Sequence, residues 1–108
     1  MSLSTHVLDT TQGRPAAHMP VRLDRYAGDT WMPLAEAATD GDGRLRDLPA
    51  GEPGTYRLRF GTGPYFVAHG VETFYPEVSV VFTMTDGDAH YHVPLLVSPY
   101  GYSTYRGS

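Results

Sequence analysis

The sequence contains no cysteine among its 108 residues. A disulfide framework and a thiolate metal site are therefore excluded, and the absence is compatible with a reducing compartment. The chain also has only eight basic residues, scattered along its length, against twelve acidic ones, which gives a formal charge of −4. Because nucleic-acid binding depends on a basic stripe that neutralises phosphates, we expect no nucleic-acid partner.

Long hydrophobic stretches are absent as well. No apolar run approaches the roughly 20 residues that a membrane-spanning helix needs. Residues 1–13 have neither the basic start nor the apolar centre of a secretory signal. We therefore expect a soluble cytoplasmic protein with no membrane partner. The length is that of one domain, so we predict a single domain over residues 1–108.

The sequence is rich in turn-forming residues and in strand-forming residues. It has 12 glycines and nine prolines beside plentiful aromatic and β-branched residues, a combination typical of short strands separated by turns. Alternation of apolar and polar side chains predicts about eight strands, over residues 3–9, 19–26, 31–39, 44–48, 55–60, 78–85, 89–98 and 101–106. The stretch 31–39 also contains good helix formers, but it lies between two hairpin-like turns. This pattern predicts an all-β antiparallel sandwich of two sheets.

Two further local signals complete the expected fold. Thr62 is suited to cap a helix, Pro64 to its first turn and Gly70 to its end, which predicts one short helix over residues 64–69. The segment Asp86-Gly87-Asp88 predicts a hairpin turn between the two strands that flank it.

The strand over residues 89–98 has two different faces. Tyr91, Val93, Leu95 and Val97 share one face, which we expect in the core; the opposite face mixes His90 and His92 with proline and leucine. A mixed face of this kind indicates the wall of a ligand cleft or of a subunit contact. Two alternatives stay open: a solvent-facing strand with incidental histidines, or a His-x-His metal pair.

The glycine–aspartate turn at residues 40–43 resembles a fragment of a calcium loop. The calcium motif needs a glutamate at its twelfth position, where this chain has Gly51, so we expect a hairpin turn and no calcium. Arg44 directly follows the turn. A guanidinium held at a strand start can bind a carbonyl or an anionic ring oxygen with two parallel hydrogen bonds.

Three stretches carry a family resemblance: residues 3–16 (LSTHVLDTTQGRPA), 39–44 (TDGDGR) and 90–108 (HYHVPLLVSPYGYSTYRGS). Together they resemble the hydroxyisourate hydrolase branch of the transthyretin-like family, and the closing Tyr-Arg-Gly-Ser is highly specific to that branch. The resemblance covers essentially the whole chain. It implies a transthyretin-like sandwich of two four-stranded antiparallel sheets with one short helix. It also implies a homotetramer, a dimer of dimers, with the active sites in a channel between the dimers.

The resemblance also implies the reaction and the site. The reaction is hydrolysis of a ring amide-type C–N bond of 5-hydroxyisourate, giving 2-oxo-4-hydroxy-4-carboxy-5-ureidoimidazoline in urate breakdown, with no metal or organic cofactor. By motif match, the catalytic set is His6, Arg44, His92 and Ser108, and substrate binding adds Tyr105, Arg106 and Gly107 to His6, Arg44 and Ser108.

Each implied residue has a chemical role. Water is a weak nucleophile, so His6 or His92 takes its proton, and the sequence does not choose between them. Arg44 holds the ring oxygens and stabilises charge at the attacked carbonyl. Tyr105 and Ser108 add hydrogen bonds that orient the substrate, and Arg106 is either a second anion partner or part of an ion pair at the channel rim.

The alternative function is that of a small-molecule carrier, since transthyretin itself carries a hormone on this fold. A carrier channel does not need two histidines, Arg44 and the Tyr-Arg-Gly-Ser segment. The sequence contains all of them, so we expect an enzyme.

Overall fold

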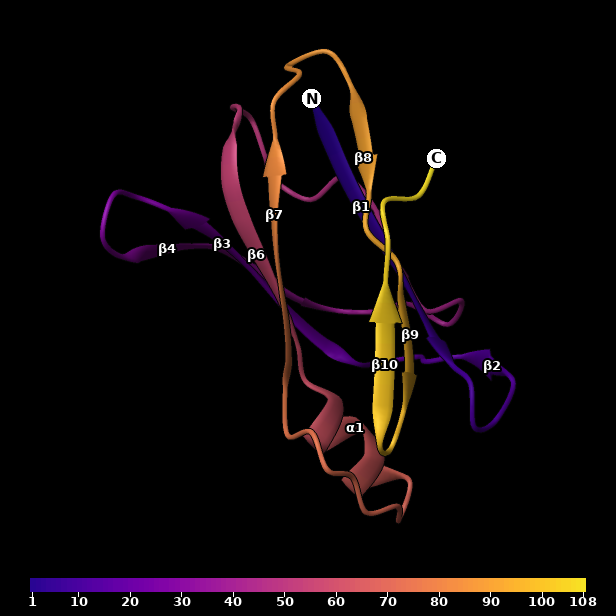
Figure 1. Cartoon of the computed structure of the whole chain (residues 1–108). Helices are drawn as coiled ribbons and strands as arrows, with labels where there is room; N and C mark the ends of the chain where they lie inside the picture. The colour runs from indigo at the N-terminus through magenta and orange to yellow at the C-terminus, as the bar shows by residue number, and fades with distance from the viewer.

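Two β-sheets pack face to face in the computed structural model, which describes residues 1–108 (Figure 1). One sheet has four strands in the order β4 (Trp31–Ala38), β3 (Pro20–Tyr26), β6 (Gly54–Phe60) and β7 (Val78–Met84). All of its pairs are antiparallel. The ambiguous stretch 31–39 is a strand because it pairs with β3 from Trp31 to Ala38.

The second sheet is built around β1 (Ser2–Asp9). Its main path runs β10 (Gly101–Thr104), β9 (Leu95–Ser98), β1 and β2 (Arg14–Pro15), while β5 (Arg44–Leu45) and β8 (His90–His92) also pair with β1. β8 and β9 run parallel to β1, and its other partners are antiparallel. The predicted two-sheet sandwich is therefore confirmed, but this sheet has six strands, most of them short, where four were expected, and its pairings are mixed where antiparallel pairing was expected.

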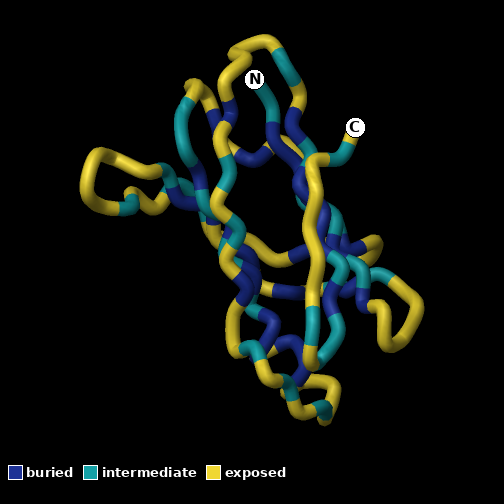
Figure 2. Tube along the Cα trace, in the orientation of Figure 1, coloured by how far each residue is buried: buried dark blue, intermediate teal, exposed yellow.

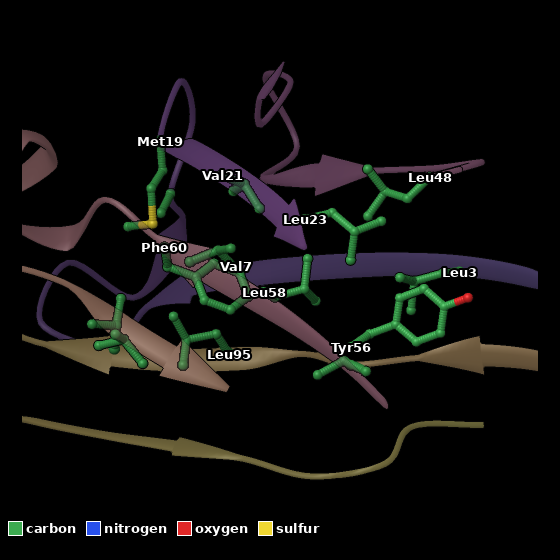
Figure 3. Close-up of a cluster of buried hydrophobic side chains, with 14 of the residues drawn as sticks. Leu3, Val7, Met19, Val21, Leu23, Leu48, Tyr56, Leu58, Phe60 and Leu95 are labelled. Carbon is green, nitrogen blue, oxygen red and sulfur yellow. The ribbon is translucent and has the colours of Figure 1, made fainter. Parts of the chain in front are cut away.

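The hydrophobic core lies between the two sheets (Figure 3). Apolar and polar side chains alternate most strictly in β6. Its Tyr56, Leu58 and Phe60 are buried and point inward. They meet Leu3 and Val7 of β1 and the apolar side chains of β3. Full burial of a large apolar side chain contributes about 1.5–3 kcal/mol. Buried residues are spread along the strands, and the tips of the outer loops are exposed (Figure 2).

The single helix α1 (Thr62–Ala68) follows β6. The prediction that Thr62 caps it is wrong: the N-cap is Gly61, without a side-chain hydrogen bond, and the Thr62 hydroxyl donates to the Tyr75 carbonyl at 2.8 Å. The helix ends as predicted before Gly70, whose φ of +70° suits glycine. Its seven residues leave the structure with no helix able to cross a membrane.

Two predictions about residues 86–98 need correction. The turn at 86–88 does not close a hairpin, because β7 pairs with β6 in one sheet and β8 pairs with β1 in the other. The chain crosses between the sheets here, and the Tyr91 hydroxyl accepts the backbone N–H groups of Thr85 and Asp86. The predicted strand 89–98 is interrupted between β8 and β9, where Pro94 has no N–H for a ladder bond.

Candidate functional site

The outer face of the β1 sheet gathers the predicted polar residues. Along β1, Leu3, Thr5, Val7 and Asp9 alternate with Ser4 and His6, which therefore occupy the opposite face; Ser4 is also largely buried, with 9% exposure. β8 runs parallel to β1 with Ser4 opposite His92, and β5 runs antiparallel with His6 opposite Arg44. Residues paired in register share a face of a sheet. His6, Arg44 and His92 therefore share one face of the sheet, with His6 beside Arg44 and His92 beside Ser4, although they come from three distant parts of the chain.

His92 is half-buried on β8. Its Nδ1 atom lies 2.8 Å from Oγ of Ser4. Burial lowers the pKa of His92 below its ordinary value of 6.5, and the charges of Arg44, His6 and His90 lower this pKa further. The imidazole is therefore neutral at pH 7 and has a lone pair available to accept a proton.

His6 is positioned by the turn that precedes β5. Its Nε2 atom lies 2.9 Å from the Asp42 carbonyl oxygen, so Nε2 carries a proton and donates it. The turn is held by Asp40, whose carboxylate accepts the backbone N–H groups of Arg44 and Asp42 at 2.9 Å each. The hydrogen bond from the Arg44 N–H is the main cause that lowers the pKa of Asp40.

The same turn requires glycine at position 43. Gly43 has a φ of +75°, and an added Cβ would lie 2.5 Å from the Val7 carbonyl oxygen. Only glycine allows this close approach of the turn to β1 without strain. The predicted tight turn at residues 40–43 is thus confirmed, but it is not a hairpin, because β4 pairs with β3 in one sheet and β5 pairs with β1 in the other. Its effect is to place Arg44 against His6.

A polar cavity of about 300 Å³ opens at Arg44 and His92, and His6 is not among the residues that line it. None of its lining residues is hydrophobic: they are Ser4, Thr5, Arg44, Arg46, Asp47, His90, His92 and Ser108. A larger hollow of about 510 Å³ lies beside α1. It contains none of the residues assigned by resemblance, so we assign the candidate site to the smaller cavity. The structure contains no cluster of three or more histidine, aspartate or glutamate side chains arranged to hold a metal ion.

Part of the segment 105–108 reaches the cavity. The Gly107 N–H donates to the His92 carbonyl at 2.8 Å, and Ser108 lines the cavity. Tyr105 is exposed by 59%, and the Arg106 guanidinium lies 4.5 Å from the centre of the Tyr91 ring. Tyr91 belongs to the inward face of β8. Within one chain, the structure therefore brings Gly107 and Ser108 to the histidines and leaves Tyr105 and Arg106 apart from them.

Sequence reasoning gave Ser4, Arg46 and Asp47 no role, although all three line the cavity. Ser4 was detectable in principle, because it shares a strand face with His6. Its contact with His92 depends on the parallel pairing of β1 and β8, which joins residues 88 positions apart. No local pattern in the sequence contains that pairing.

Comparison with known proteins identifies the family. The model of the HIUase/Transthyretin family matches residues 3–107. The 5-hydroxyisourate hydrolase of Caulobacter vibrioides is 50% identical, with 98% of this chain and 97% of that protein covered. The mouse 5-hydroxyisourate hydrolase is 49% identical, with 98% and 94% covered. The chain belongs to the HIUase/Transthyretin family.

Solved structures agree with this assignment. The 5-hydroxyisourate hydrolase of Klebsiella pneumoniae has a TM-score of 0.88 at 37% identity, with 99% of this chain and 98% of that chain covered. Sea bream transthyretin in complex with thyroxine has a TM-score of 0.92 at 30% identity, with 97% and 93% covered. An (S)-allantoin synthase has a TM-score of 0.89 at 38% identity and covers 99% of this chain, which spans only 43% of its length. The transthyretin-like fold is thus confirmed.

Proposed function

We propose that this protein is a 5-hydroxyisourate hydrolase, which opens the ring of its substrate to give 2-oxo-4-hydroxy-4-carboxy-5-ureidoimidazoline. The observation that carries the proposal is the polar cavity at which Arg44, His92 and Ser108 meet, with His6 paired in register to Arg44. Relatives that are about half identical over nearly the whole chain are hydrolases of this substrate.

His92 is the base in this proposal. Its lowered pKa keeps it neutral, and its Nδ1 atom is engaged by Ser4, which leaves Nε2 to take a proton from water. The hydroxide then attacks a ring carbonyl, the C–N bond breaks, and the departing nitrogen takes up the proton held on Nε2 of His92. Arg44 supports the negative charge that develops on the carbonyl oxygen. His6, fixed by the Asp42 carbonyl and paired in register with Arg44, orients the substrate together with Arg44.

The carrier alternative is less supported. The fold alone does not separate the two functions, since the sea bream transthyretin structure superposes at least as well as the Klebsiella hydrolase. The site distinguishes the enzyme from the carrier. All residues that line its cavity are non-hydrophobic, and a carrier of an apolar hormone has no need of such a cavity. The sequence identities to the hydrolases support the same conclusion.

We further propose a homotetramer, a dimer of dimers. β7 and β10 each have only one neighbour, so each sheet ends in an edge with unpaired backbone groups. Between these edges lies a hollow lined partly by Val81 and Tyr105, which are exposed by 57% and 59%. A second copy that continues both sheets covers these groups. The Tyr105 and Arg106 of a neighbouring copy are the residues we expect to complete the substrate site.

The assembly has a direct test. Size-exclusion chromatography with light scattering should give the mass of four chains. Val81→Asp places a charge at the exposed sheet edge and should reduce that mass toward one chain. A parent protein of one-chain mass would contradict the tetramer.

We place the reaction in urate breakdown in the cytoplasm, a location compatible with the absence of cysteine.

The function is tested with freshly made substrate. Urate and a urate oxidase generate 5-hydroxyisourate, whose near-ultraviolet absorbance decays slowly without a catalyst. The protein should accelerate this decay, and a His92→Asn variant should lose at least the roughly 10²-fold that acid–base catalysis contributes. Circular dichroism verifies that the variant is folded. A parent protein that leaves the decay unchanged would refute the function.

A further inference from the structure

A continuous chain of hydrogen bonds runs along the outer face of β1 and β8. Nδ1 of His92 lies 2.8 Å from Oγ of Ser4, and the same Oγ lies 3.1 Å from Nε2 of His90. Nδ1 of His90 then lies 2.5 Å from Oγ of Ser2. The parallel register creates this chain, because Ser2 pairs with His90 and Ser4 pairs with His92. The four polar side chains therefore alternate between the two strands.

The direction of these bonds follows from counting protons. A serine hydroxyl has one proton, so Ser4 can donate to only one of its two histidines. A base at Nε2 of His92 requires that the Nδ1 atom of this residue carries the proton. Nδ1–H of His92 then donates to Ser4, the Ser4 hydroxyl donates to Nε2 of His90, and Nδ1–H of His90 donates to Ser2. Each of the three hydrogen bonds then joins one donor to one acceptor.

The two histidines of the chain differ in how well they tolerate a positive charge. His92 is half-buried and lies near Arg44 and His6, and these neighbours together with burial lower its pKa. His90 is exposed. A proton taken up at His92 is therefore costly to keep there, whereas an imidazolium at His90 is solvated by water. Besides these groups, Arg46 and Asp47 beyond β5 also line the cavity.

We propose that Ser4 and His90 form a proton relay that transfers positive charge from His92 to the surface during catalysis, an inference that rests on the function proposed above. When Nε2 of His92 accepts the proton of the attacking water, its Nδ1 proton passes to Oγ of Ser4. The original Ser4 proton passes to Nε2 of His90. His92 and Ser4 stay neutral, His90 becomes an imidazolium, and solvent removes the proton from Nδ1 of His90. When the ring nitrogen departs, it takes the Nε2 proton of His92. The relay then runs in reverse, so that Nδ1 of His92, the Ser4 hydroxyl and, from solvent, Nδ1 of His90 regain their protons.

The relay is tested by removing its outer end and replacing it with a diffusible base. In His90→Ala, at low buffer concentration, kcat should fall about tenfold or more, a part of the ~10²–10⁴-fold effect of proton transfer. KM should stay within about twofold of the parent value, because His90 acts on the proton and not on substrate binding. Added imidazole should restore much of the lost kcat, and a bulky buffer of similar pKa should not. His69→Ala removes another exposed histidine, outside this cavity, and should behave like the parent.

A second pair of variants tests the inner link. Ser4→Thr keeps the hydroxyl and should retain most of the activity, whereas Ser4→Ala should lose kcat to a similar extent as His90→Ala. Circular dichroism and thermal unfolding should show that both variants are folded. Full kcat of His90→Ala at low buffer, equal kcat of the two Ser4 variants, or a loss that imidazole does not repair would each overturn the relay. A rise in KM with kcat unchanged would also overturn it and would make His90 a substrate contact. An inactive parent refutes the proposed function instead, so the two failures are distinguishable.

Discussion

Gly107→Ala is the substitution that tests the geometry of the site most directly. Gly107 forms an isolated bridge with His92, and its N–H donates to the His92 carbonyl at 2.8 Å. A Cβ at position 107 would lie 2.6 Å from Cδ2 of His92, 3.3 Å from Cγ and 3.4 Å from Cβ. The new methyl group therefore points at the side of the imidazole ring.

The size of the effect follows from these distances. Carbon atoms in contact are normally about 3.5–4.0 Å apart, so the ring and the methyl group must separate by about 1 Å. The ring can move only by disturbing its hydrogen bond with Ser4, and the segment can move only by carrying Ser108 away from the cavity. Misplacement of a catalytic group by 1 Å costs about 10²-fold in rate, which corresponds to about 2.7 kcal/mol.

The assay compares kcat/KM for 5-hydroxyisourate in the parent, in Gly107→Ala and in Gly87→Ala. Gly87 is a matched control, because a Cβ there would meet nothing within 4 Å. We expect a loss of about 10²-fold in the first variant and no loss in the control. Thermal unfolding should be similar for all three proteins, since residue 107 lies outside the core. If Gly107→Ala keeps its activity within a factor of about three, the segment does not hold His92 in place.

Four further predictions concern the same site. Because the pKa of His92 is lowered and only the neutral form accepts a proton, the acid limb of kcat/KM should lie below pH 6.5, and a limb above that value would contradict a His92 base. Arg44→Lys should be a poor enzyme, because an ammonium does not replace a planar two-bond contact; parental turnover and affinity would leave Arg44 without a role. Removal of residues 105–108 should leave a folded sandwich, seen by circular dichroism, that has lost most of its hydrolysis, and full activity would remove the segment from the site. Dialysis against a strong chelator should leave activity intact, and a loss restored by zinc would reveal a metal requirement.

The sequence by itself determined which face of a strand is buried, and so indicated two sheets packed around one core. Strict alternation at Tyr56, Leu58 and Phe60 predicted β6 and its inward face, and the same pattern separated the buried Tyr91 from the mixed face of His90 and His92. These features are local, since a strand has a period of two and one buried face. Family resemblance then supplied the candidate residues. It could not explain why they belong together.

Only the tertiary structure decided which residues meet. The parallel pairing of β1 with β8 places Ser4 beside His92, and the antiparallel pairing with β5 places His6 beside Arg44. The tertiary structure also showed that the turn at residues 86–88 connects the two sheets and does not form a hairpin. Sequence patterns report the face of each strand. They do not report the partner or the register, because these depend on how distant strands together cover one core.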